Sequence, residues 1–238
     1  MSGHSKWSSI KHKKGAADAK RGKLFSKLAK TITVAVKSGG ADESTNFTLR
    51  LAIDKARQAN MPKDNIIRAI SRGSGEGDDG KELKGVVYEA MGPGGASILI
   101  EVLTDNTNRS ITNVKTIIGK NGGNFDAKVL WQFDRKGVVR IEDISSVGDR
   151  DELELTLIDV GVEDLSWENG LELIGELSDL QTIEKSLGDL GLKASEAQPE
   201  YVAKESIQLS AEDEEKLMNL MDKLDDDDDV QNVYTNAA

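Results

Sequence analysis

Apolar residues recur at helical spacing along residues 16–37, and lysines recur between them. At about 100° per residue in an ideal helix, Leu24, Leu28 and Ile32 fall on one side, together with their apolar neighbours. The lysines fall on the other side, and Gly39-Gly40 supplies a stop signal. The pattern therefore predicts an amphipathic helix over 16–37 with one apolar face and one lysine face.

Two shorter helices are predicted after this one. Residues 43–58 carry apolar side chains at helical spacing, and Pro62 suits the first turn of a short further helix. The glycines and acids of 72–85 then indicate a linker. The first part of the chain is thus predicted to be a small basic module of three helices.

Beyond the linker the hydrophobic period changes to two. Residues 85–91 and 96–105 are predicted strands, and GPGG between them (Gly92–Gly95) indicates a hairpin turn. It is not a Walker phosphate loop, because no G-x-x-x-x-G-K-[ST] pattern follows. A helix over 108–123 and a strand over 128–133 complete a β-β-α-β unit.

A second layer of helices and strands is predicted over 136–205. Its elements are a strand over 136–143, a helix over 149–161, a strand or hairpin arm over 166–176, a helix over 179–191, and a strand over 192–207 that breaks at Pro199. The chain then ends in a helix over 210–224, with Ser210 as its N-cap, and a strand over 230–237.

The last helix and strand supply what the β-β-α-β unit lacks. We therefore expect an α+β protein of three domains. Residues 1–78 form the helical domain, residues 79–135 and 206–238 form a mixed sheet domain, and residues 136–205 form a further α+β domain inserted into it.

Charge divides the chain more sharply than its formal net charge of −11 suggests. Residues 1–72 hold 16 lysines and arginines against 5 acids, and the rest of the chain holds 15 against 37. The basic part favours phosphate backbones as partners, and the acidic part, which repels phosphates, favours protein partners.

Composition disfavours several classes of function. The chain has no cysteine, which excludes disulfides, thiolate catalysis and cysteine–zinc sites. It has no apolar run of the ~18 residues that a membrane span needs, and a cytoplasmic protein fits best. His4 and His12 are the only histidines. Since no Ser-His-Asp, metal or Walker constellation is present, we expect neither an enzyme nor a cofactor.

The predicted nucleic-acid interface lies in the arm (residues 1–15) and on the lysine face of 16–37. Trp7 is suited to stacking on a base, whereas a solvated helix face is the simpler explanation of the lysines. Sequence-specific recognition needs a helix that reads bases, for which Arg50, Arg57 and Gln58 are weak candidates, and no helix-turn-helix pattern is clear. The candidate set is Lys6, Trp7, Lys11, Lys13, Lys14, Lys20, Arg21, Lys23, Lys27, Lys30, Arg50 and Arg57.

Three loops carry alternatives. TDNTNR (Thr104–Arg109) caps the following helix through Asp105 or Asn106, or contacts RNA or protein with Arg109. IIGKNGG (Ile117–Gly123) resembles the GXXG loop of a KH domain, but a strand follows it, which favours a helix C-cap. DDDDD (Asp225–Asp229) lacks the spacing of a calcium loop and predicts a solvated acidic turn.

Several longer stretches resemble the YebC/PmpR family, and the resemblance covers nearly the whole chain. They are MSGHSKWSSIKHKKGAADAKRGKLFSKLAKTI, NMPKDNIIRAI, YEAMGPGGASILIEVLTDNTNR, GGN before WQF, and the terminal VQNVYTN. The departures are local: Ser110 stands where the family pattern has threonine, and NFDAKVLWQF replaces a more glycine-rich stretch. The resemblance implies three α+β domains, the last inserted in the second, and a role in gene expression.

The same resemblance implies two kinds of nucleic-acid partner. Bacterial members are described as probable transcriptional regulators that bind DNA, and mitochondrial relatives resemble translational activators that act on the ribosome. Members are also described as translation factors that relieve stalling at proline runs. We expect a ribosome-associated translation factor that binds ribosomal RNA, with a DNA-binding transcriptional regulator as the alternative. The start at MSGHSKW, without a transit extension, implies a bacterial cytoplasmic protein.

Overall fold

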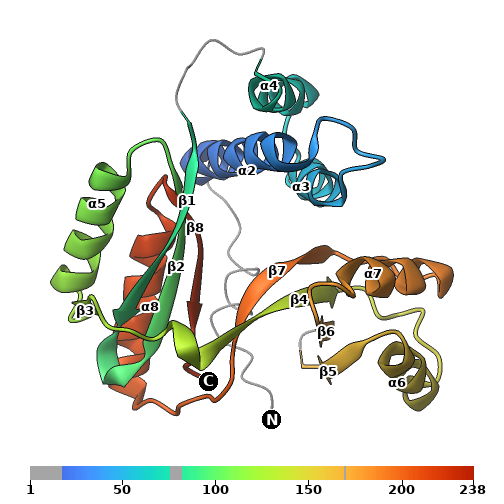
Figure 1. The fold of residues 1–238 in the computed structure, drawn as a ribbon. Helices are drawn as coiled ribbons and strands as arrows, with labels where there is room; N and C mark the ends of the chain where they lie inside the picture. Colours follow the sequence, from blue (N-terminus) through green and yellow to red (C-terminus); the bar gives the residue numbers. More distant parts are fainter. Residues whose placement is uncertain (1–17, 76–81, 169) are drawn as a thin grey trace. The chain divides into compact units, whose positions relative to one another are not determined.

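A computed structural model describes residues 18–75, 82–168 and 170–238 of the chain. Its first part is a module of three helices with a core of its own (Figure 1). Ile32, Leu49 and Ile53 are fully buried there. The helices are α2 (Asp18–Gly39), α3 (Phe47–Gln58) and α4 (Lys63–Gly73).

Asn46 explains why α3 begins later than the predicted residue 43. Its side-chain oxygen accepts from the amide of Leu49 at 3.0 Å, which is the geometry of an N-cap. Its Nδ2 donates to the carbonyls of Ala35 and Gly40 at 2.8 and 2.7 Å. One buried amide thus ends α2 and starts α3, and it fixes the angle between them.

The first sheet has the strand order β3-β1-β2-β8, and all three pairings are antiparallel. β1 and β2 form the predicted hairpin, whose turn places Gly94 and Gly95 at positive φ. β8 pairs with β2 from the far end of the chain. The strands are β1 (Lys84–Met91), β2 (Ser97–Thr104), β3 (Asn124–Phe125) and β8 (Val230–Thr235).

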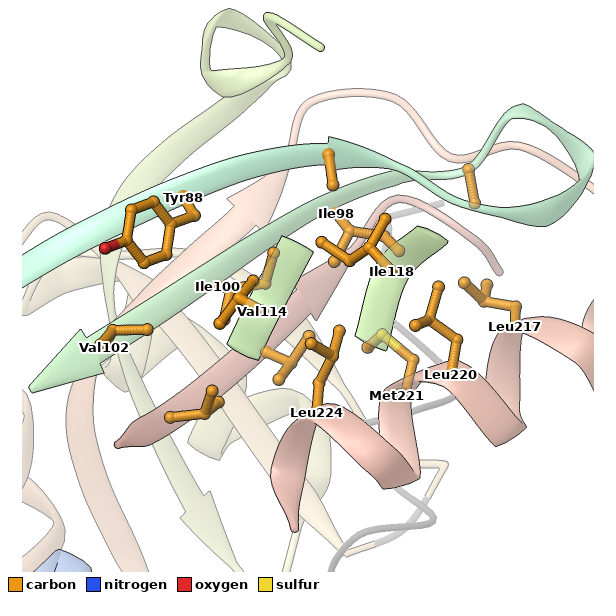
Figure 2. Close-up of a cluster of buried hydrophobic side chains, with 14 of the residues drawn as sticks. Tyr88, Ile98, Ile100, Val102, Val114, Ile118, Leu217, Leu220, Met221 and Leu224 are labelled. Carbon is orange, nitrogen blue, oxygen red and sulfur yellow. The ribbon is translucent and has the colours of Figure 1, made fainter. Parts of the chain in front are cut away.

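Two helices, α5 (Thr107–Lys120) and α8 (Ala211–Asp225), pack against this sheet. Figure 2 shows the α8 side chains turned toward the apolar side chains of β2, with Val114 and Ile118 of α5 beside them. Ser210 caps α8 as predicted, because its hydroxyl accepts from the amide of Asp213 at 3.2 Å. The four α8 residues in this core are Leu217, Leu220, Met221 and Leu224.

Residues Phe133–Val202 form a second compact unit, with the strand order β5-β6-β4-β7. Arg140 lies within it and pairs with Glu172, Glu196 and Glu200, the last through Nη2 and Oε2 at 2.9 Å. The elements are β4 (Phe133–Ile141), α6 (Arg150–Asp159), β5 (Val162–Ser166), β6 (Leu171–Gly175), α7 (Leu180–Asp189) and β7 (Glu196–Ala203). With its N-terminal helices and two sheets, the chain has the predicted α+β fold.

Two predicted details of these strands are wrong. Residues 128–132 are not a strand, because the Glu89 carboxylate accepts from the amides of Val129 and Leu130 at 2.7 and 2.8 Å. A short 3₁₀ turn at Leu130–Gln132 follows instead. Pro199 does not break β7, since this strand lies at the edge of its sheet, where a missing N–H is tolerated.

Candidate nucleic-acid interface

The structure leaves part of the predicted interface undescribed. Lys6, Trp7, Lys11, Lys13 and Lys14 lie outside the described residues, and the side chain of Lys20 does as well. The remaining candidates lie on two helices of the N-terminal module: Arg21, Lys23, Lys27 and Lys30 on α2, and Arg50 and Arg57 on α3.

Three of the α2 lysines contact the residues from the end of α8 to the start of β8, which we name the acidic segment (Asp225–Asp229). Lys23 Nζ donates to the carbonyl of Asp226 at 2.8 Å. Lys27 Nζ donates to the carbonyl of Asp225 and lies 3.4 Å from its carboxylate. Positions 23, 27 and 30 share one helix face. The predicted lysine face of α2 therefore faces acids of the same chain.

Lys30 makes the most extensive polar contact of the three lysines. Its Nζ donates to Asp229 Oδ1 at 2.8 Å, to the carbonyl of Asp228 at 2.9 Å and to the carbonyl of Leu103 at 3.2 Å. Only 19% of its side chain is exposed, against 6% for Asp229. The ammonium group is thus surrounded by oxygen acceptors from β2 and from the acidic segment.

Asp229 joins this lysine to the sheet. Its Oδ2 accepts from Arg109 Nη2 and Ser110 Oγ, each at 2.7 Å, and from Thr104 Oγ1 at 3.1 Å. Burial alone raises the pKa of Asp229, but the hydrogen bonds from Lys30, Arg109 and Ser110 outweigh it and lower the pKa to about 2. Asp229 is therefore an ionised, buried acceptor at neutral pH.

The loop Thr104–Arg109 is built around the same carboxylate. Asn106 caps α5, with its Oδ1 accepting from the amide of Arg109 at 3.1 Å, so the capping alternative is the one that the structure shows. Arg109 bridges Asp105 and Asp229 through Nη2, at 2.9 and 2.7 Å. Hydrogen bonds to Asp229 and Asp105 raise the pKa of the Arg109 guanidinium. The Arg109 side chain is nevertheless 47% exposed.

The prediction of a solvated acidic turn is wrong for part of the acidic segment. Asp229 is only 4% exposed, because cations from α2 and α5 and two hydroxyl groups converge on it. Sequence reasoning also missed Thr104 and Ser110 as its partners. The available signal was the complementarity between lysines three and four residues apart and a run of five acids, but about 200 residues separate the two sequences.

The IIGKNGG sequence ends a helix, as the C-cap alternative predicts. α5 stops at Lys120, and Gly122 has φ +78°. β3 follows directly. No second helix continues from the loop as a KH domain requires.

Further basic side chains lie on α3 and α4, and all those named here except the half-buried Arg50 are exposed. Arg57 lies 3.1 Å from Asp54 and 3.4 Å from Glu43, and Arg50 lies over the Phe47 ring at 5.0 Å. α4 carries three further cations, Lys63, Arg68 and Arg72. Cations of this kind can bind phosphate oxygens. Among the described residues, no group of three histidines or acids could hold a metal ion, and no helix is long and apolar enough to cross a membrane.

The turn between α3 and α4 is short. Four residues, 59–62, join the two helices. Asn60 adopts a left-handed backbone with φ +58°, and the buried Met61 donates its amide to the carbonyl of Ala56 at 2.9 Å. Two helices joined by a turn of this length occur in the helix-turn-helix class of DNA-binding motifs. The sequence of this pair carries no clear helix-turn-helix pattern.

Fold and charge together define the class of the protein, which is an α+β protein with a basic helical module and two sheets. The chain belongs to the TACO1/YebC family. The model of the TACO1/YebC second and third domain matches residues 83–237, and the model of the TACO1/YebC N-terminal domain matches residues 5–76. The resemblance to this family that the sequence suggested is thereby confirmed.

Curated relatives match over the full length. A protein from Thermoanaerobacter pseudethanolicus is 47% identical over 240 residues, covering 100% of this chain and 97% of the relative. One from Corynebacterium kroppenstedtii is 47% identical, covering 99% and 95%. Both are named probable transcriptional regulatory proteins. The crystal structure of a conserved hypothetical protein from Aquifex aeolicus is similar with a TM-score of 0.87 and 36% identity, covering 98% and 97%.

Proposed function

We propose that the protein is a non-enzymatic regulator of gene expression that binds nucleic acid through its basic N-terminal module. The observation that carries this proposal is the concentration of cations there. Between residues 18 and 75, twelve lysines and arginines stand against five acids, and the residues before them add four lysines and no acid. Such clustering is the electrostatic signature of phosphate binding. The names of the relatives support a regulatory role.

DNA is the first candidate partner. The relatives are named as transcriptional regulators, and α4 is the second helix of a pair with a short turn, which is the position of the recognition helix in helix-turn-helix proteins. Lys63 and Arg68 are exposed near the start and middle of α4. In this reading they contact phosphates or base edges, and the arm lies along the backbone.

Ribosomal RNA is the second candidate, in which case the protein is a ribosome-associated translation factor. The cations of the module are compatible with this candidate as well as with DNA. Lysine ammonium groups on the arm and on α2 neutralise phosphates, and phosphate contacts carry no sequence information. A-form RNA and B-form DNA both present such phosphates.

The unit Phe133–Val202 is the candidate surface for protein partners. It carries 18 acids against 6 lysines and arginines, so it repels phosphates. Leu155 and Ile158 on α6 are 67% and 56% exposed. In our proposal the basic module holds the nucleic acid, and this unit faces proteins.

Crosslinking in cells followed by sequencing of the bound nucleic acid tests the proposal and separates its two candidates. We expect enriched genomic DNA segments for a transcriptional regulator and enriched ribosomal RNA segments for a translation factor. A variant with Lys6, Lys11, Lys13 and Lys14 changed to Glu should lose the enrichment. A matched control changes four exposed lysines outside the module, Lys84, Lys120, Lys185 and Lys193, to Glu and should keep it. Equal recovery from both variants would refute the role of the arm.

A further inference from the structure

The contact between α2 and the acidic segment has the chemistry of a lysine helix on a phosphate backbone. Three lysines on one helix face meet oxygens from four of five consecutive residues, either carbonyls or carboxylates. Lysine binds phosphate as a compact charge with three donors. The acidic segment therefore presents to α2 a row of anionic and polar oxygens like the one that a nucleic acid would present.

This contact is polar, whereas the cores on its two sides are separate. The buried residues of the hydrophobic core of the N-terminal module all lie between 28 and 69. The core under the first sheet draws its buried residues from 88–118 and 217–237. Beside the three lysines, Thr31 Oγ1 donates to Gln231 Oε1 at 3.2 Å. Neither core thus contains residues from both sides of this contact, which hydrogen bonds and ion pairs hold.

The number and kind of polar partners also change along α2. Lys30 reaches Asp229, which Arg109, Ser110 and Thr104 hold to the sheet. Lys23, at the other end, reaches the backbone carbonyl of the exposed Asp226. The acidic segment thus continues from α8 at Asp225 and is held by side chains of β2 and α5 at Asp229, whereas Lys23 contacts it only through a backbone carbonyl.

We infer that the acidic segment is an intramolecular competitor for nucleic acid and occupies the lysine face of α2 when no nucleic acid is bound. This competition presupposes the nucleic-acid binding proposed above and adds a regulatory element to it. An intramolecular ligand acts at a high effective concentration. Only the molecules whose lysines are released can bind nucleic acid through α2, so the apparent affinity for nucleic acid falls in proportion to their fraction. A backbone phosphate that reaches α2 must displace these aspartates.

Neutralising the segment while leaving its anchor intact tests the inference. The variant changes Asp225, Asp226 and Asp228 to Asn and retains Asp229. It removes three negative charges and the carboxylate that pairs with Lys27, and it leaves the backbone-carbonyl contacts of Lys23 and Lys30 in place. The control changes three exposed acids of the same unit, Asp126→Asn, Glu205→Gln and Glu215→Gln, and alters the net charge equally. Fluorescence anisotropy with a labelled random-sequence DNA duplex and a ribosomal RNA fragment gives the dissociation constants. We expect about fivefold to tenfold tighter binding for the segment variant and less than about twofold for the control.

A measurement without nucleic acid keeps the two proposals separate. Acylation of lysines by an N-hydroxysuccinimide ester, followed by mass spectrometry, reports how accessible each ammonium group is. Lys27 and Lys30, whose side chains are mostly buried, should react more slowly than the exposed Lys37 and Lys63 in the wild type. Lys27, which loses its carboxylate partner Asp225, should react faster in the segment variant. If the lysines are released but both nucleic acids bind as in the wild type, the competition is refuted. If neither the wild type nor the variant binds nucleic acid at low salt, the proposed function itself falls.

A reversible crosslink tests the inference by holding the contact closed instead of weakening it. The chain has no cysteine, so Thr31→Cys with Gln231→Cys adds one pair at the contact, which a short bis-methanethiosulfonate can bridge. The bridged protein should bind nucleic acid several-fold more weakly than the unbridged double variant, and reduction should restore the affinity. Equal binding before and after reduction would contradict the inference.

Discussion

Asp229→Asn tests the physical account of the central polar cluster. Asparagine keeps the shape of the side chain but removes its charge and offers one acceptor oxygen in place of two. Oδ1 of Asp229 serves Lys30, while Oδ2 serves Arg109, Ser110 and Thr104. Whichever way the amide turns, its NH₂ group meets donors. We therefore expect the unit that contains β2 and β8 to lose stability at neutral pH.

The size of this destabilisation follows from the pKa of Asp229. It is about 2 in the folded protein against 3.8 for an ordinary aspartate, and one pKa unit corresponds to about 1.4 kcal/mol. Solvent screens part of this interaction, so the charge contributes about 1–2 kcal/mol. Because the folded pKa is the lower one, the contribution is complete above pH ~4 and disappears as the pH falls from about 4 to about 2.

Hydrogen exchange measured by mass spectrometry on the β2 and β8 amides is the appropriate assay, because it reports this unit separately from Phe133–Val202. The opening free energy of Asp229→Asn should lie about 1–2 kcal/mol below the wild type at pH 7, and the gap should close toward pH 2. Asp228→Asn is the control, since Asp228 contacts Lys30 through its backbone carbonyl. A gap below about 0.5 kcal/mol at pH 7, or one that does not change with pH, would refute the reasoning.

Three further substitutions test the packing around the site. Ser210→Ala should destabilise α8 by about 1 kcal/mol in chemical denaturation, and Ser210→Asp should restore the cap. Gly73→Ala places a methyl group 2.6 Å from Val36 Cβ and 2.7 Å from the Thr33 carbonyl, so the N-terminal module should be destabilised by about 1–3 kcal/mol. The control Gly22→Ala should not destabilise the module, because no atom lies within 4 Å of the methyl group that it adds. Arg140→Met leaves the carboxylates of Glu172, Glu196 and Glu200 together, and the unit 133–202 should lose about 3–5 kcal/mol of stability at pH 7. It should regain stability below pH ~5 as these acids take up protons; no recovery at acid pH would contradict the electrostatic explanation.

The sequence predicted correctly those elements that are determined by residues close to them in the chain. The serine before the first turn of α8 and the glycines between β1 and β2 act within a few residues of their own position, and both elements form as predicted. The hydrophobic spacing of α2 likewise predicted most of its buried face, because Leu28 and Ile32 lie in the core of the module, whereas Leu24 is 38% exposed.

Elements that depend on distant partners could not be predicted in the same way. Val129 and Leu130 have the apolar character of a strand, but the carboxylate of Glu89, about 40 residues earlier, accepts from their amides. Lys27 and Asp225 are 198 positions apart. The charge pattern shows that the lysines share one helix face and that the aspartates form one run. Only the fold shows that the two groups contact each other.

The pairing of Lys30 with Asp229 also changes the interpretation of the interface. The sequence alone suggested that Lys20, Lys23, Lys27 and Lys30 face a nucleic acid. In the structure three of them face the acidic segment. Our proposal therefore assigns the first encounter with phosphate to the arm and to the exposed basic side chains of α3 and α4. Their positions cannot be derived from periodicity, because the helical pattern distinguishes polar from apolar faces only.

The salt dependence of nucleic-acid binding tests the central claim most directly. The dissociation constants of wild-type protein for a random-sequence duplex and for a ribosomal RNA fragment are measured over a range of about 50 to 300 mM KCl. If the basic module binds phosphates, log Kd rises linearly with log [KCl], and changing Lys6, Lys11, Lys13 and Lys14 to Glu lowers the slope by about one for each phosphate that the arm no longer neutralises. The control with Lys84, Lys120, Lys185 and Lys193 changed to Glu should keep the wild-type slope. Binding that does not depend on salt, or equal slopes for all three proteins, would contradict the account.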